Sequence, residues 1–306
     1  MELYLPIAQM SVHWLIILGM GAAVGLITGL FGIGGGFILA PLLLFSGIPP
    51  VVAVSTTTSQ VAAATFSGLV THWKNKTLDL QMAVIMTAGG LAGTVAGVYI
   101  FRILREMGQM EFSISISYVV LLGAVGGLML TESLRTMREA RAGRPSGGRK
   151  PGQHNWIHGL PFKMRFRRSR LYISVIPPLA LSFIVGILSA IMGVGGGFIL
   201  VPLMIYLIKM PSSIVPGTTL FQVLFVTASA TVMHAVDNYT VDVVLALLLI
   251  AGGVIGVQIG VRIGTKLRGE QMRFLLALLT LAIAIRLLYD LVVTPADLFN
   301  LRIGDN

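Results

Sequence analysis

The sequence lacks cysteine altogether and contains little charge. With no Cys among its 306 residues, a disulfide scaffold, a thiol nucleophile and a cysteine-ligated zinc site are all excluded. Charged residues make up 11% of the chain, against about 25% in soluble domains. Apolar residues make up 55%, and the mean hydropathy is +0.88. This composition predicts a polytopic membrane protein.

Basic residues are missing from the first part of the chain and concentrated in its middle. No Lys or Arg precedes Lys74, so a signal peptide's basic region is lacking and we expect the first apolar segment to be retained. Eleven of the 22 Lys and Arg residues lie between Arg135 and Arg170. Such clustering is typical of a cytoplasmic loop, so the net charge of +10 does not indicate nucleic-acid binding. We expect the basic and aromatic stretch from Lys163 to Arg170 to contact the anionic cytoplasmic leaflet of the membrane.

The chain is an internal duplication. Residues 25–41 (GLITGLFGIGGGFILAP) recur 161 positions later as residues 186–202 (GILSAIMGVGGGFILVP). The correspondence continues with one-residue slips through the equivalent pairs His72 and His234, and Asp79 and Asp242. A repeat of this length predicts two homologous halves.

Each half contains five apolar segments. These are 12–33, 37–48, 51–72, 78–101 and 112–132, then 171–194, 198–209, 212–235, 240–263 and 271–293. Segments 37–48 and 198–209 are too short to cross about 30 Å of hydrocarbon. We expect each to be a re-entrant half-helix that turns back at a triple glycine. The predicted organisation is a first repeat (1–132), a basic cytoplasmic linker (133–170), a second repeat (171–294) and a tail (295–306).

The distribution of positive charge favours inverted repeats. In each half, the first long segment and the half-helix after it form a pair broken by the glycine triplet. If each such pair begins and ends on the same face of the membrane, each half crosses the membrane an odd number of times. The basic positions Lys74, Lys76, Lys209, Arg262 and the linker then all face the cytoplasm, with Arg102 and Arg105 as exceptions. The predicted fold is therefore an all-α polytopic membrane protein with two inverted repeats, two glycine-broken half-helices and about eight transmembrane segments.

The two glycine triplets are the predicted ligand site. Glycine permits positive φ and close approach of the backbone to a ligand. A helix that restarts at Phe37 or Phe198 presents unpaired N–H groups and roughly half a positive charge. Two such ends match a small anion. The predicted backbone site comprises Gly34, Gly35, Gly36 and Phe37 with Gly195, Gly196, Gly197 and Phe198; the alternative is that these glycines only permit tight packing.

Polar side chains on the helix after each half-helix complete the predicted site. They are Thr57, Thr58 and Gln60 in the first half and Thr218, Thr219 and Gln222 in the second. Burying such groups without partners costs on the order of 1–3 kcal/mol each, so we expect them to face protein, a cavity or an anion. Bonding between or within helices is the alternative.

Other polar and small residues have more than one interpretation. The pairs His72 with Asp79 and His234 with Asp242 could carry a coupling proton, or could anchor helix ends at the interface. Arg286 and Asp290 are expected to form an ion pair or to snorkel. Two glycine rows, at 89, 93 and 97 and at 253, 256 and 260, predict a helix-packing seam, or alternatively a homodimer face. The sequence shows no catalytic constellation, metal-ligand spacing or cofactor motif, so we expect no enzyme activity, metal or cofactor.

The duplicated glycine motifs resemble those of the sulfite exporter TauE/SafE family. The likeness extends over residues 12–293, apart from the Arg-rich linker. The resemblance implies an inner-membrane transporter, commonly an exporter, of sulfite or small organosulfonates, and it adds Pro41 and Pro202 to the motif. The residues themselves indicate only a secondary transporter of a small anion by alternating access, with proton coupling as an option. A passive anion channel, and a scaffold or sensor acting through the linker, are the alternatives.

Overall fold

The computed structural model describes residues 2–31, 33–141, 161–166, 168–169, 171–211, 213–264 and 269–292. The first half contains strands β1 (Glu2–Leu5) and β2 (Met10–His13) and helices α1 (Trp14–Phe31), α2 (Gly36–Phe45), α3 (Pro50–Lys74), α4 (Leu80–Glu106) and α5 (Met110–Arg141). The second contains β3 (Lys163–Phe166), β4 (Leu171–Ser174), α6 (Ile176–Met192), α7 (Gly197–Tyr206), α8 (Val215–Val236), α9 (Val243–Gly264) and α10 (Gly269–Val292). The helices reproduce the ten predicted apolar segments with shifted ends.

Six of the described helices are long and apolar enough to cross a membrane: α1, α4, α5, α8, α9 and α10. Helix α3 has 25 residues but includes the Ser/Thr run, and α6 has 17 residues. Helices α2 and α7 have ten residues each, which is about 15 Å at 1.5 Å per residue. That length is about half the thickness of the hydrocarbon layer, as their short apolar runs predict.

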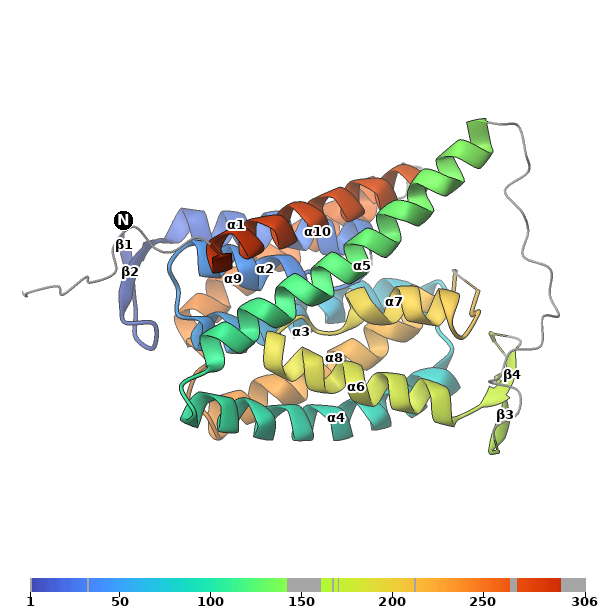
Figure 1. Cartoon of the computed structure of the whole chain (residues 1–306), viewed down its shortest axis with the longest axis horizontal. Coiled ribbons are helices and arrows are strands. Elements are labelled where there is room, and N and C mark those ends of the chain that lie inside the picture. Colours follow the sequence, from blue (N-terminus) through green and yellow to red (C-terminus); the bar gives the residue numbers. More distant parts are fainter. Residues whose placement is uncertain are drawn as a thin grey trace, which may run out of the picture.

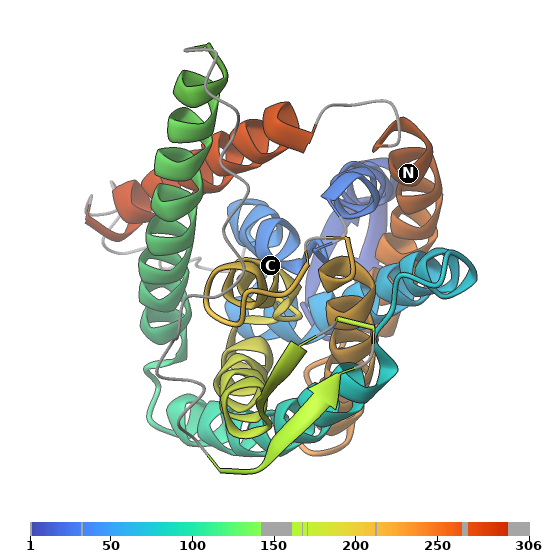
Figure 2. The ribbon, with the colours of Figure 1, turned by 90° about the vertical axis from the view of Figure 1, so that its right-hand side faces the viewer.

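Helices of one half pack on helices of the other. Helix α1 lies against α9, α4 against α6, α3 against α8, and α5 against α10. Figure 2 shows the half-helices α2 and α7 near the centre of the molecule, with the longer helices around them. Equivalent helices make equivalent contacts, so the two halves build one common core.

Rows of glycine let the outer pairs approach closely. A Cβ atom on Gly89, Gly93 or Gly97 would lie 2.0–2.7 Å from a backbone oxygen of α6. A Cβ atom on Gly252, Gly256 or Gly260 would lie 2.1–2.2 Å from an oxygen of α1. The predicted packing seam is thus present inside the chain, with Gly252 rather than Gly253 in the second row. A homodimer remains a prediction.

Two short hairpins precede α1 and α6, and the sequence-based all-α fold did not include them. Strands β1 and β2 pair antiparallel, as do β3 and β4. The hairpins are 161 residues apart, like the glycine motifs, and lie at opposite ends of the molecule in Figure 1. Segment 171–194 therefore starts as a strand, and its helix begins at Ile176.

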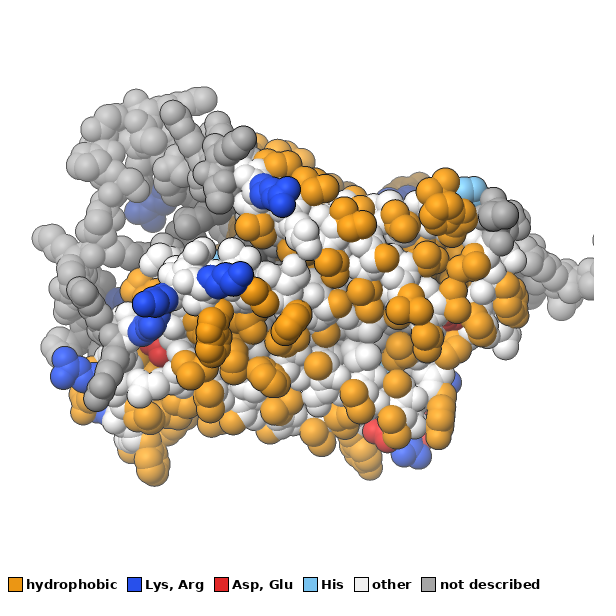
Figure 3. Space-filling model, turned by 180° about the vertical axis from the view of Figure 1, so that it is seen from behind, with side chains coloured by type: hydrophobic (Ala, Val, Ile, Leu, Met, Phe, Trp, Pro, Cys, Tyr) orange, Lys and Arg blue, Asp and Glu red, His pale blue; other side chains and the backbone are white. Residues whose placement is uncertain are grey.

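The hairpins and α5 also change the description of the linker. Helix α5 continues to Arg141, nine residues past the expected boundary at 132. Residues 163–166 belong to β3, while residues 142–160, Arg167 and Arg170 lie outside the described part of the chain. Lipid contact by this segment remains a prediction. On the face shown in Figure 3, apolar side chains cover the middle, and Lys and Arg side chains lie mainly towards the left-hand end.

Candidate functional site

Both predicted helix interruptions are present. Helix α1 ends at Phe31 and α2 begins at Gly36, and α6 ends at Met192 and α7 begins at Gly197. Gly34, Gly195 and Gly196 have φ values of +74°, +79° and +78°, a conformation that side chains disfavour. The amides of Leu39 and Leu200 donate to the carbonyls of Gly35 and Gly196 at 3.1 and 2.9 Å. The amides of Ile38 and Ile199 donate to the same two carbonyls, at 3.0 and 3.1 Å. The amides of Phe37 and Phe198 precede these first hydrogen bonds of α2 and α7, where no preceding turn supplies an acceptor.

The two interruptions lie against each other at the centre of the molecule. A Cβ atom on Gly36 would lie 2.6 Å from the carbonyl oxygen of Gly193, and one on Gly197 would lie 2.4 Å from that of Ile33. The rings of Phe37 and Phe198 stack with their centroids 4.4 Å apart and an interplanar angle of 13°. Both rings are buried. The N-terminal ends of two half-helices from different repeats therefore converge.

Equivalent valines of α3 and α8 cover the breaks. A Cβ atom on Gly34 would lie 3.7 Å from Val61 Cγ1 and 4.0 Å from Val223 Cγ1. The sequence-based site omits both valines, although each directly follows a predicted glutamine. Hydroxyl side chains also lie beside the breaks: a Cβ atom on Gly35 would lie 2.4 Å from Thr28 Oγ1, and one on Gly196 would lie 3.9 Å from Ser189 Cβ. The surroundings of the breaks are therefore valine side chains, a few hydroxyls and the backbone.

The predicted threonines are buried and bond within their own helices. Thr57 and Thr219 donate to carbonyl oxygens one turn earlier, at 2.7 and 3.0 Å. Thr58 donates to the Ser55 carbonyl at 2.7 Å and lies 2.8 Å from the Thr231 hydroxyl of α8. Thr218 donates to the Ile214 carbonyl and accepts from the Asp79 amide. These contacts fit the structural alternative, and Thr231 is a partner that the sequence analysis missed.

The predicted glutamines differ from the threonines because their side chains are unsatisfied. Gln60 and Gln222 are fully buried, and within the described residues neither side-chain oxygen nor nitrogen has a hydrogen-bond partner. A Cβ atom on Gly253 would lie 2.5 Å from Gln60 Nε2, and one on Gly90 would lie 2.5 Å from Gln222 Nε2. Each amide therefore packs against a glycine of the neighbouring long helix.

The two predicted aspartates anchor the hairpins. Asp79 Oδ2 accepts from the amide (3.0 Å) and hydroxyl of Ser169, between β3 and β4. Asp242 Oδ2 accepts from the amides of Ile7 and Ala8, between β1 and β2, at 2.9 and 3.4 Å. The Oδ1 atoms accept from amides in the first turns of α4 and α9. Each carboxylate therefore caps a helix of its own repeat and holds the hairpin of the other.

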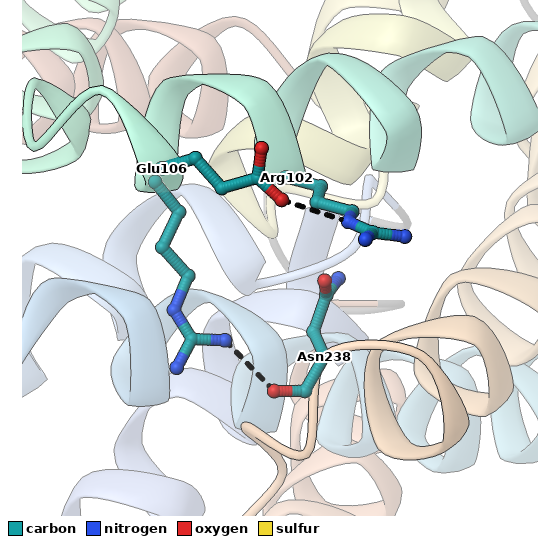
Figure 4. A network of polar contacts seen from close by, with 4 residues as sticks. Arg102, Glu106 and Asn238 are labelled. Carbon is teal, nitrogen blue, oxygen red and sulfur yellow. Dashed lines mark hydrogen bonds and ion pairs between the residues drawn. The ribbon is translucent and has the colours of Figure 1, made fainter.

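The predicted histidines lie at the ends of α3 and α8 and have local partners. His72 Nδ1 lies 2.9 Å from Thr77 Oγ1. His234 is fully buried, with Nε2 3.0 Å from the Ala190 carbonyl and Nδ1 3.0 Å from Asn238 Nδ2. Arg105 donates to the Asn238 carbonyl at 2.8 Å, and Figure 4 shows Asn238 near the exposed ion pair of Arg102 and Glu106. The two arginines that depart from the charge rule thus have partners at this end of the molecule.

Comparison with known proteins gives a consistent result. Residues 17–287 match the family described as "Sulfite exporter TauE/SafE". The chain is 25% identical over 289 residues to "Probable membrane transporter protein YunE" of Bacillus subtilis, covering 92% of this chain and 98% of the relative. It is 27% identical over 286 residues to a "Probable membrane transporter protein" of Xylella fastidiosa, covering 92% and 97%. A segment of 51 residues, 16% of this chain and 12% of the relative, is 53% identical to "Sulfite exporter TauE/SafE family protein 6" of Arabidopsis thaliana. No solved structure matches the chain.

Proposed function

Because the chain belongs to the sulfite exporter TauE/SafE family, we propose that it is a secondary transporter that exports sulfite or a small organosulfonate across the inner membrane. One observation carries this proposal: the glycine breaks of two homologous repeats meet at Phe37 and Phe198. Two half-helix N-termini supply about one positive unit there. That charge suits a monoanion, without a buried Lys or Arg.

The proposal includes inverted repeats with about eight transmembrane segments, namely the ten helices without α2 and α7. The pairs α1 with α2 and α6 with α7 each return to their starting face, so each half makes three net crossings. The hairpins of the two repeats lie at opposite ends in Figure 1. The cross-repeat contacts are reciprocal, because the Asp79 amide donates to Thr218 and the Asp242 amide donates to Thr56, both at 3.1 Å. Such an arrangement suits alternating access, in which one repeat rocks against the other around a central site.

In this mechanism the buried glutamines become ligand donors. Gln60 and Gln222 lie one residue before the valines that cover the breaks. Their amides have no partner in the described structure, so a rearrangement that turns these side chains from Gly253 and Gly90 towards the break would give each amide an oxyanion oxygen to bind. The threonines next to them stabilise these helices and remain part of the proposed site.

The hairpins serve as the two gates. Each hairpin is held to the opposite repeat through a buried aspartate, so opening one end breaks one set of carboxylate hydrogen bonds and leaves the other intact. A coupling proton would act at these ends, through Asp79 with His72 or Asp242 with His234. Protonation of the carboxylate removes the charged acceptor and weakens its hold on the hairpin.

The proposal is tested by flux in proteoliposomes. Gly36→Ala and Gly197→Ala each place a methyl group within 2.6 Å of a carbonyl oxygen of the opposite break. We expect both variants to lose sulfite efflux while still eluting as homogeneous protein. The control is Gly19→Ala in α1, where a Cβ atom meets nothing within 4 Å. Full sulfite efflux in both the Gly36→Ala and Gly197→Ala variants would contradict a substrate site at the glycine breaks.

The same vesicles separate a transporter from a passive channel. Unlabelled sulfite inside the vesicles should accelerate uptake of labelled sulfite from outside. In alternating access, a site occupied by substrate returns to the outer face faster than an empty one. Taurine, sulfoacetate, sulfate and a carboxylate serve as competitors that define the substrate. Flux without this acceleration would indicate a channel.

A further inference from the structure

A cleft of about 740 Å³ opens between the end of α10 and the start of α5. The end of α2 and the turn to α3 line its side, and the turn between α4 and α5 contributes Gly108. Helix turns and ends gather here, so the cleft lies near one surface of the membrane. It is separate from the glycine breaks, whose residues do not line it.

The cleft contains both a cation and an anion on one helix. Arg286 Nη1 lies 3.1 Å from Asp290 Oδ1, and their side chains are 57% and 40% exposed. The Arg286 guanidinium also lies 5.7 Å from the ring centroids of Phe45 and Tyr289, which restrict its orientation. An exposed pair at this spacing contributes little stability by itself, so both groups can accept a further partner at little cost.

The surroundings of the pair are apolar. Ile285, Leu288 and Phe112 are exposed on the same two helices, as expected for side chains that face lipid. A charged group at such a position is normally directed towards the protein interior or paired with lipid headgroups. The ligand of this cleft is therefore expected to be amphiphilic.

The order of the charges indicates which amphiphile fits. Asp290 lies one helical turn, about 6 Å, closer to the end of α10 than Arg286. In a phospholipid whose headgroup faces the water, the phosphate lies deeper than the amine. We propose that this cleft binds a zwitterionic phospholipid with a primary amine, with its phosphate on Arg286, its ammonium on Asp290 and an acyl chain that runs from Arg286 towards the middle of α10.

The chemistry of the pair distinguishes common lipids. A phosphate can accept two parallel hydrogen bonds from a guanidinium. A primary ammonium has three N–H donors for a carboxylate, whereas a choline group has none and a glycerol headgroup has no positive charge. Phosphatidylethanolamine should therefore bind more tightly than phosphatidylcholine or phosphatidylglycerol with the same acyl chains.

Native mass spectrometry of the purified full chain in detergent tests the proposal, with each of these three lipids added in turn. Arg286→Gln should weaken phosphatidylethanolamine binding by about tenfold, as expected for a lost hydrogen bond to a charged group. Asp290→Asn should remove the preference over phosphatidylcholine. The chain offers a matched control in Arg102 and Glu106, an equally spaced, exposed pair at the end of α4 that does not line the cleft. Arg102→Gln and Glu106→Gln should leave binding unchanged.

Four results would overturn the proposal. These are equal binding of the three lipids, equal losses in the α4 control variants, a preference for the amine that survives Asp290→Asn, and equally tight binding of soluble phosphoethanolamine. A fifth result would also overturn the proposal: a dimer in the same spectra that dissociates with Arg286→Gln would assign the cleft to a second copy of the chain.

Discussion

Gln60 and Gln222 combine full burial with unsatisfied hydrogen-bonding groups. Leaving such an amide unpaired costs on the order of 1–3 kcal/mol, and the cost is incurred twice in equivalent positions. A polar group that only filled space could be replaced by an apolar side chain at no loss. The duplicated cost is therefore consistent with a role that appears only when ligand is bound.

Replacing either glutamine with methionine should separate stability from function. Gln60→Met keeps the volume and removes the unsatisfied amide, so we expect it to raise the free energy of unfolding by about 1–3 kcal/mol. Sulfite efflux should fall at the same time. Thermal unfolding and vesicle flux provide the two measurements. Gln81→Met, at an exposed position of α4, is the control, and a destabilised Gln60→Met protein would refute the prediction.

Among the elements, the pair α4 and α6 depends on the absence of side chains. A Cβ atom on Gly93 would lie 2.0 Å from the Phe183 carbonyl oxygen, whereas one on Gly127 of α5 meets nothing within 4 Å. Gly93→Ala should destabilise the protein by about 1–3 kcal/mol through overpacking. Gly127→Ala should raise its stability by up to about 1 kcal/mol through helix propensity. Thermal unfolding in detergent measures both, and equal shifts would mean that this seam is not closely packed.

Loss of either aspartate should loosen only the hairpin to which that aspartate is hydrogen-bonded. Asp79→Asn keeps the side-chain size but removes the charged acceptor for Ser169, so the amides of β3 and β4 should exchange hydrogen about ten- to a hundredfold faster. Asp242→Asn should do the same for β1 and β2. Hydrogen exchange by mass spectrometry locates the effect. The exposed Asp237 supplies the control, Asp237→Asn, and faster exchange in the opposite hairpin would refute the pairing.

The helices could be predicted from the sequence and the two hairpins could not, because only the helices leave a local pattern in the sequence. The helices and both breaks follow from long apolar runs and glycine triplets, which are local properties of the chain. Four-residue strands are too short for a period to emerge, and the basic residues around Phe166 suggested a membrane-surface segment. The hairpin's anchor, Asp79, lies 90 residues from Ser169, and no single-sequence pattern links two such positions.

At the scale of the whole molecule, the duplication explains why both glycine breaks could be predicted from the sequence. Their residues Phe37 and Phe198 stack on each other, and that this meeting point is the substrate site stays a prediction. The walls were not predictable, because the rotation of α3 decides whether Val61 or Gln60 faces the break. That rotation is set by Gly253, which admits the glutamine side chain, and by the Thr58 and Thr231 contact with α8. Such contacts depend on packing between helices from different repeats.

The orientation of the repeats is the remaining property of the whole molecule, and the lack of cysteine makes it directly measurable. Asn75 and Asp237 are exposed in the equivalent turns after α3 and α8. In inverted repeats, Asn75→Cys and Asp237→Cys should react with a membrane-impermeant maleimide from opposite sides, Asn75→Cys only after the cytoplasmic face is opened. The unmodified chain has no thiol and gives the background. Parallel repeats would put both turns on one side, because each half would then make an even number of crossings, and the two half-helix ends could no longer approach the centre from opposite leaflets.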